Sequence, residues 1–259
     1  MDTPNGAHFR DGEVVMVLDD KRRGQIINLK AGSGSNTHNG MIDHDQIIGN
    51  SEGYLVETRK GKHFRVVRPS ISEIIELMPR GAQVIYPKDL GQILMMADIR
   101  PGLKVLESGV GSGALSMTLL NAGVDLVGYE IREDFKNRAT NNVEKFLPSE
   151  CLERYRVELR DVYEEISEGC FDRVVLDLPE PWRVVDHLEG VLQSGGLVMA
   201  YQTSVGQLEQ FRSALAKWRY FMPQTVEVSV RPWHYSENVL RPEHRMVAHT
   251  GFLTVARKL

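Results

Sequence analysis

The chain has 259 residues, 42% of them hydrophobic and 25% charged, with a formal net charge of −4. This composition supports a large buried core, and the net charge argues against a generic polyanion binder. No apolar stretch approaches the ~20 residues of a spanning helix, and residues 1–13 show no apolar leader, so we expect a cytoplasmic protein without a membrane segment. Cys151 and Cys170 have no metal-ligand spacing, so neither a disulfide nor a metal site is expected.

Residues 1–80 are predicted to form a small β domain. Gly, Asn and Asp turn residues separate four short runs with β-like alternation, at 14–18, 25–29, 54–58 and 64–68. We expect residues 32–36 to form a flexible loop or hairpin tip. Residues 70–78 have helical spacing and connect this domain to the rest of the chain.

Residues 81–259 alternate between strand-like and helix-like segments, which predicts an α/β domain with a doubly wound parallel sheet. The expected strands are 104–108, 126–130, 155–159, 173–178 and 197–201, and the expected helices begin at residues 114, 132, 182 and 207. The last two runs, 225–230 and 252–256, have no helix between them and predict an antiparallel C-terminal hairpin at one sheet edge. Such a sheet binds its ligand at the carboxyl ends of its strands.

The segment VLESGVGSGALSMTL at 105–119 reads as a buried strand, a glycine loop and a helix. Gly109, Gly111 and Gly113 leave room for a tight turn and a close ligand. Glu107 would repel a dinucleotide pyrophosphate and attract a cationic sulfonium or amino group, which favours S-adenosylmethionine (SAM). The same glycines also satisfy the loose dehydrogenase fingerprint, so a nicotinamide dehydrogenase remains an alternative.

Three acidic residues lie at the ends of predicted strands or just after them. Glu130 has the position of an acid that accepts hydrogen bonds from ribose hydroxyls, although an ordinary acid at a helix N-terminus would look the same. Asp161 is a candidate for the adenine amino group or a simple cap. Asp177 follows a buried run and precedes LPEPW, whose prolines stiffen the chain. A rigid carboxylate there can orient a base that is being alkylated.

Aromatic and basic residues allow both functional and structural readings. Trp182 can stack on a base or anchor the core, and Tyr86, before Pro87 at a helix start, can flank a target base or simply be half-buried. Residues 211–259 hold eight Lys and Arg against three Asp and Glu, a basic tail that can contact RNA or form a solvated face. Its three histidines are read as RNA-facing or structural groups: His234, His244 and His249. A second basic cluster comprises Arg59, Lys60, Lys62, Arg65 and Arg68.

Several motifs, in order, resemble the tRNA (adenine-58-N1)-methyltransferase family of bacteria and archaea. They are MPRGAQVIYPKDLGQIL, VLESGVGSGALS, the acid of GYEIRED, VVLDLPEPW and RPEHRMVAHTGFLTVARK. The resemblance implies a class I methyltransferase (Rossmann-like) sheet, SAM as cofactor, a homotetramer, and methylation of adenine N1 in the T-loop of tRNA.

The resemblance also implies roles by position. The methionine side of the cofactor would be lined by Glu107, Gly109, Gly111, Ser112, Gly113, Ala114 and Leu115. Glu130 would bind the ribose, Asp161 the adenine amino group, and Phe135 would lie near the adenine ring. Asp177 would be the catalytic carboxylate beside the cofactor, and Tyr86 would face the target base. A non-catalytic tRNA-binding subunit is a further alternative, but it would be expected to lose the glycine loop or Asp177.

Overall fold

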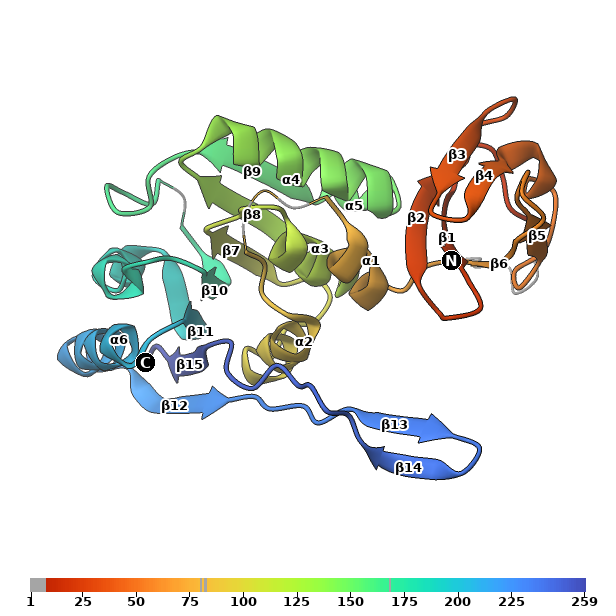
Figure 1. Ribbon diagram of the computed structural model, residues 1–259. Helices are drawn as coiled ribbons and strands as arrows, with labels where there is room; N and C mark the ends of the chain where they lie inside the picture. The colour runs from red at the N-terminus through yellow and green to blue at the C-terminus, as the bar shows by residue number, and fades with distance from the viewer. Residues whose placement is uncertain (1–7, 80, 82, 168) are drawn as a thin grey trace. The chain divides into compact units, whose positions relative to one another are not determined.

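A computed structural model describes residues 8–79, 81, 83–167 and 169–259. The chain divides into two units, Met1–Pro79 and Arg80–Leu259 (Figure 1). Residues 1–7 of the expected leader-free N-terminus, together with Arg80 and Ala82 of the MPRGAQ motif, lie outside the described residues. Within the described ranges, no helix combines the length and apolarity needed to cross a membrane.

The first unit is built on a four-stranded antiparallel sheet in the order β2-β1-β6-β5. Its strands are β1 (Val14–Leu18), β2 (Gly24–Asn28), β5 (Leu55–Glu57) and β6 (His63–Val67). Alternate residues of these strands enter a core with Phe9 and Phe64 fully buried. Helix α1 (Ile71–Leu77) comes next in the chain, and it begins with a capping box between Ser70 and Glu73.

The prediction of a loop at residues 32–36 is wrong from Gly34 onward. Strand β3 (Gly34–Thr37) pairs antiparallel with β4 (Gly40–Asp43), and a short 3-10 turn, η1 (His44–Gln46), comes after them. The composition of this segment did not indicate a strand, because Gly, Ser and Asn favour turns. The register of the hairpin is fixed instead by buried side chains such as Ile42, which lies fully buried in the core of this unit.

The second unit is built on a seven-stranded sheet in the order β12-β15-β11-β10-β7-β8-β9 (Figure 1). The five strands from β11 to β9 are parallel, and β15 and β12 continue the sheet antiparallel. The strands are β7 (Lys104–Ser108), β8 (Asp125–Glu130), β9 (Tyr155–Leu159), β10 (Phe171–Leu176), β11 (Leu192–Gln202), β12 (Phe221–Glu227) and β15 (Phe252–Arg257). The mostly parallel sheet predicted from the alternating pattern is therefore confirmed.

Helices cover both faces of this sheet. The elements are α2 (Pro87–Met96), α3 (Ala114–Asn121), α4 (Glu133–Phe146), α5 (Glu150–Glu153), α6 (Val205–Lys217), and the 3-10 turns η2 (Pro181–Val184) and η3 (His187–Gly190). Glu107 of β7 is hydrogen bonded to Ser116 of α3, so α3 covers the face of the sheet on which the Glu107 side chain lies. Leu106, which points the other way, packs in the cluster with η2, η3 and α6.

The direction in which the chain adds strands to the sheet reverses between β7 and β10. After β7 the chain builds β8 and β9 on one side, and it then returns to add β10 and β11 on the other. Glu107 pairs with Val175 and Ser108 with Leu176, so the residues just after both strands emerge side by side. A doubly wound sheet binds its ligand at this switch point.

Two details of the second unit differ from the predictions. The helix expected from Trp182 is wrong: two 3-10 turns, η2 and η3, occupy the segment. Pro179 and Pro181 lack backbone donors, and the spacing of buried Val184, Val185 and Leu188 suits short turns against the sheet. In addition, the chain between β12 and β15 forms a two-stranded ribbon of β13 (Trp233–Ser236) and β14 (Val239–Pro242). This ribbon extends away from the sheet (Figure 1).

Candidate functional site

The glycine loop after β7 is held by close backbone contacts. Gly109 has a φ of +88°, and a Cβ built there would lie 2.0 Å from the Asp177 carbonyl oxygen. Gly113 has a φ of +82°, and its Cβ would lie 3.1 Å from Ala139 Cα of α4. Gly111, by contrast, has a φ of +55° and faces open space. The loop is therefore closed toward the protein at two glycines and open toward a ligand at the third.

Glu107 is a fully buried carboxyl group beneath this loop. Ser116 Oγ donates to its Oε2 at 2.6 Å, and the Tyr155 hydroxyl donates to Ser116 Oγ at 3.0 Å. The other oxygen, Oε1, is buried and has no partner among the described residues. Burial, with added repulsion from Asp177 and Glu130, raises the pKa of Glu107 to about 8. A buried unpaired oxygen is costly, so this one is suited to a cationic ligand.

The raised pKa of Glu107 makes the stability of the protein depend on pH. With a pKa of about 8 against 4.5 for the free side chain, Glu107 holds its proton more tightly when folded. The unfolded chain ionises first, so the free energy of unfolding should fall as the pH rises from about 4.5 to 8, by up to about 1.4 kcal/mol per pH unit. Glu107→Gln should make this slope clearly shallower in urea unfolding of the ligand-free protein, and the raised pKa of Asp177 accounts for part of the slope that remains. An unchanged slope in the variant would contradict the assignment.

Glu130, at the end of β8, is nearly buried and accepts two backbone hydrogen bonds. Gly111 N–H donates to Oε2 and Arg132 N–H to Oε1, each at 3.0 Å. Both oxygens keep a further lone pair for hydroxyl donors. Glu130 is thereby fixed to the glycine loop itself, which sets the spacing between loop and carboxylate.

Three further residues expected around the cofactor lie in the same loop or at the start of α3. Ser112, Ala114 and Leu115 are buried, and Ser112 Oγ accepts from Gly81 N–H at 3.2 Å. Asn142 Nδ2 donates to the Ser112 carbonyl at 2.9 Å, which ties the loop to α4. Phe135 is also buried, with the Arg132 guanidinium 3.9 Å from its ring centroid. One ring face therefore already has a cationic neighbour.

Asp161 lies after β9 and is half-buried. Its Oδ1 accepts from Tyr163 N–H at 2.8 Å, as in an Asx turn. Among the described residues, Oδ2 makes no hydrogen bond, so one oxygen remains for a ligand donor. Asp161 therefore caps the local turn with Oδ1 and can accept a hydrogen bond from a ligand with Oδ2.

Asp177 lies directly after β10, and its N–H donates to the Ser108 carbonyl at 2.9 Å. None of the described residues donates a hydrogen bond to its carboxylate. Burial alone raises the pKa of Asp177 to about 7. Perturbed carboxyl groups of this kind, in a cavity beside a ligand loop, are typical of functional sites.

Asp177 lines two adjoining cavities. One, of about 380 Å³, is also lined by Tyr86, residues 83–85, Val247, His249 and Thr250; we call it the acceptor cavity. The other, of about 390 Å³, is lined by Leu178, Pro179, Tyr201, Thr203 and Gln207. Tyr201 and Thr203 line both. The structure thus brings Tyr86 and Asp177 together, although they are 91 positions apart in the chain.

A polar network lies in the first turn of α2, directly after Tyr86 in the chain, and sequence reasoning missed it. Lys88 Nζ contacts both carboxylate oxygens of Asp89 at 2.9 and 3.0 Å, Thr250 Oγ1 at 2.6 Å and the Val228 carbonyl at 2.7 Å. Thr250 Oγ1 in turn donates to Asp89, which is fully buried. The network joins the start of α2 to the segment before β15. Both segments belong to the family motifs, but nothing in either motif indicates a pairing across about 160 residues.

The C-terminal histidines divide between structural and cavity positions. His249 lines the acceptor cavity and contacts Glu227 Oε1 at 2.6 Å. This hydrogen bond raises the pKa of His249. His234 lies 3.4 Å from Glu243. Trp182, which belongs to η2, packs against the core, which favours its interpretation as an anchor.

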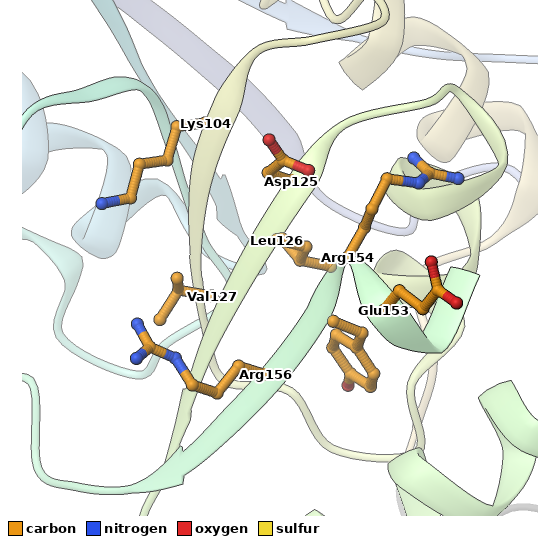
Figure 2. A pocket seen from close by; sticks show the side chains of 8 residues that line it. Lys104, Asp125, Leu126, Val127, Glu153, Arg154 and Arg156 are labelled. Carbon is orange, nitrogen blue, oxygen red and sulfur yellow. The ribbon is translucent and has the colours of Figure 1, made fainter. Parts of the chain in front are cut away.

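Another hollow, of about 330 Å³, lies at the opposite edge of the sheet, where β7, β8 and β9 begin. Figure 2 shows Arg154 and Arg156 reaching in opposite directions from the start of β9. Arg154 donates to the Val124 carbonyl at 3.0 Å, and Arg156 lies 3.4 Å from Glu158. These cations do not converge on a common point, so the hollow adds nothing to the site.

Comparisons with known proteins agree with this geometry. A family model described as the tRNA methyltransferase complex GCD14 subunit matches residues 73–241, and a TrmI-like N-terminal model matches residues 8–56. The tRNA (adenine(58)-N(1))-methyltransferase TrmI of Thermus thermophilus is 30% identical, with 94% of this chain and 96% of the relative covered. The tRNA (adenine(57)-N(1)/adenine(58)-N(1))-methyltransferase TrmI of Methanocaldococcus jannaschii is 32% identical, with 93% and 94% covered.

Solved structures give the same fold. The tRNA (m1A58) methyltransferase TrmI from Aquifex aeolicus has a TM-score of 0.83 at 29% identity, covering 98% of this chain and 99% of that one. A SAM-dependent O-methyltransferase from Thermotoga maritima has a TM-score of 0.90 at 30% identity, covering 97% and 94%. The predicted class I methyltransferase sheet is therefore confirmed.

Proposed function

The chain belongs to the family of the tRNA methyltransferase complex GCD14 subunit, and we propose that it methylates N1 of adenine 58 in tRNA with SAM as donor. One observation carries the chemistry: the unpartnered Asp177 carboxylate lines the acceptor cavity directly beside the glycine loop. The glycine loop supports a cofactor site, the acceptor cavity supports an acceptor site, and the two adjoin at Asp177. The relatives of this chain that are named for adenine-58 methylation match it over nearly its whole length.

The residues around the loop fit SAM. Gly111 faces open space, and Glu107 keeps a buried orphan oxygen for a cation. Glu107, Ser112, Ala114 and Leu115 would border the methionine part. Glu130 would accept from the ribose hydroxyls, and Asp161 from the adenine amino group, with Phe135 near the ring. When bound, SAM supplies a methyl group on a positively charged sulfur that leaves readily.

Asp177 orients the acceptor base in the proposed mechanism. Its carboxylate accepts a hydrogen bond from the 6-amino group and stabilises the positive charge that develops on the ring. The N1 lone pair lies in the ring plane and needs no base to expose it. Tyr86 flanks the base in the acceptor cavity. Most of the acceleration would come from alignment of N1 with the methyl carbon, an effect that can reach roughly 7 to 11 kcal/mol.

Product analysis separates this proposal from its alternatives. The protein is incubated with labelled SAM and an unmodified tRNA transcript, and the digested nucleosides are resolved. The proposal expects 1-methyladenosine. A ribose-methylated nucleoside would instead favour an oxygen acceptor, which the name of the Thermotoga relative suggests. Binding of SAM without any transfer would favour a non-catalytic subunit, and binding of NAD in place of SAM would favour the dehydrogenase.

Contact with tRNA is proposed through exposed basic side chains. Arg59 already pairs with Asp43 at 2.7 Å, and Arg68 pairs with Glu13 at 2.6 Å. Among the described residues, neither Lys60 nor Lys62 forms an ion pair, and both are exposed. In the basic tail, Arg231 and Arg245 are likewise exposed. These four cations are the best candidates for phosphate contacts, which would help offset the cost of turning the target base out of the folded tRNA.

The salt dependence of tRNA binding tests these contacts. We expect the affinity to fall steeply with salt, with a log–log slope that decreases by about 0.7–0.9 for each phosphate contact removed. Replacing Lys60 and Lys62 together by Gln should lower the slope by nearly two such steps. Arg59→Gln, which removes a cation already paired with Asp43, is the control and should change it less. Equal slopes for all three proteins would contradict the assignment.

We also propose that the protein is a cytoplasmic homotetramer, with a small β domain at residues 1–80 and the methyltransferase domain at residues 81–259. The β13–β14 ribbon supports an assembly, because Trp233, Tyr235 and Leu240 are 60%, 77% and 69% exposed. A lone two-stranded ribbon is marginally stable in water, and apolar side chains at this density favour burial against another surface.

A further inference from the structure

The segment after Asp177 has few backbone restraints of its own. Asp177 N–H bonds to β7, but two of the next four residues, Pro179 and Pro181, have no backbone donor. The position of the carboxylate therefore depends on what holds this segment from outside. Two side chains from distant parts of the fold do so, and neither was singled out by the sequence.

The first is Tyr163, which lies two residues beyond Asp161. Glu180 N–H donates to the Tyr163 hydroxyl oxygen at 3.0 Å. The Tyr163 ring packs against the core cluster, with the Arg183 guanidinium 4.4 Å from its centroid. Its own N–H is bonded to Asp161. Tyr163 thus joins the Asp161 turn to the segment after Asp177.

The second is Gln207, the third residue of α6. Its Oε1 accepts from the N–H groups of Thr203 and Ser204 at 2.8 and 3.1 Å, as part of the capping box. Its Nε2 donates to the Pro179 carbonyl at 2.9 Å. One amide therefore both caps the helix and holds the carbonyl two residues beyond Asp177.

We propose that Tyr163 and Gln207 are positioning residues for methyl transfer: they hold residues 178–180 from two sides and thereby fix the Asp177 carboxylate beside the glycine loop. The inference rests on the role proposed above for Asp177. Both bonds involve single atoms and restrain adjacent residues, Glu180 and Pro179. A shift of about 1 Å at a reacting centre can slow a reaction by up to roughly 100-fold, so losing either bond affects rate more than binding.

Two near-isosteric variants of the full chain test this. Tyr163→Phe keeps the ring and removes only the acceptor oxygen. Gln207→Glu keeps the capping oxygen and replaces the donor to the Pro179 carbonyl by a carboxylate oxygen, with one added negative charge. Single-turnover methyl transfer to an unmodified tRNA transcript, at saturating SAM and tRNA, should slow by about 10-fold in each. The dissociation constants for SAM and tRNA and the thermal midpoint should stay close to those of the parent protein.

The controls make the same chemical changes away from the site. Tyr220→Phe removes a buried hydroxyl that has no partner among the described residues. Gln193→Glu removes a donor to the Cys170 carbonyl. Both should retain the parent rate, and Asp177→Asn is measured alongside.

Each outcome is decisive. Slower transfer in the two test variants with unchanged affinities supports the inference. Parent rates in both, while Asp177→Asn is impaired, overturn it and leave the role of Asp177 intact. Losses of affinity and thermal midpoint in parallel with the rate also overturn it, because they indicate general damage. A parent rate in Asp177→Asn overturns the role of Asp177 and this inference with it.

Discussion

Asp177→Asn is expected to lower kcat for tRNA methylation by about 100- to 1000-fold. The amide keeps the shape of the side chain but removes the negative charge opposite the developing cationic ring. Asp177 lines the acceptor cavity and has no hydrogen-bond donor among the described residues, so its carboxylate is available to the base. The affinity for SAM, measured by calorimetry, should change by less than about 10-fold, because a transition-state interaction appears mainly in kcat.

The pH dependence of kcat/KM, measured for the parent protein and for Asp177→Asn, provides the control. The pKa of Asp177 is raised to about 7, and only the ionised form carries the negative charge that stabilises the developing cationic ring. For the parent protein, kcat/KM should therefore rise with pH through about 7, since this ratio reports the free enzyme. Asp177→Asn should lose that rise. A variant with parent activity, or one that keeps the same pH step, would show that another group carries the chemistry.

Gly109→Ala is expected to abolish activity and to destabilise the second unit. The added Cβ would lie 2.0 Å from the Asp177 carbonyl oxygen, at a φ of +88°. Backbone must therefore shift, which costs about 1–3 kcal/mol for overpacking and a further 1–2 kcal/mol for the left-handed conformation. Urea unfolding of the ligand-free protein would measure the loss of stability, and the shift also displaces Asp177 from its place beside the loop.

Gly111→Ala is the matched comparison. Its φ is +55°, and an added Cβ meets no atom within 4 Å. Only the conformational cost of about 1–2 kcal/mol remains, so this variant should fold. It should bind SAM more weakly, because the methyl group occupies the space left for a ligand. Equal stability losses in the two variants would contradict the contact at Gly109, and unchanged SAM binding in Gly111→Ala would contradict a ligand at the open face.

The parts of the fold and site predictable from sequence are those determined by local pattern. Alternation of strands and helices was enough to place Glu130, Asp161 and Asp177 at strand ends. Parallel pairing then brings Asp177 beside the loop, because β7 and β10 are neighbours at the switch point. The charge of Glu107 indicated a cationic ligand, and its buried orphan oxygen is consistent with that reading.

The parts that could not be predicted depend on contacts between distant segments. Ser116 and Tyr155 hold Glu107 from α3 and β9, and no local pattern links them. Thr250 meets Lys88 across 162 positions. The helix expected from Trp182 failed for a related reason, since the two prolines and the packing of Val184 and Val185 decide the local conformation. Tertiary context outweighs propensity at such places.

The proposed activity is methyl transfer to one atom of one nucleotide. The most direct test compares two unmodified transcripts that differ only at position 58, one with adenine and one with guanine, in single-turnover reactions with labelled SAM. We expect 1-methyladenosine at position 58 of the first transcript and almost no transfer to the second. Equal labelling of both transcripts, or label on an oxygen, would contradict it.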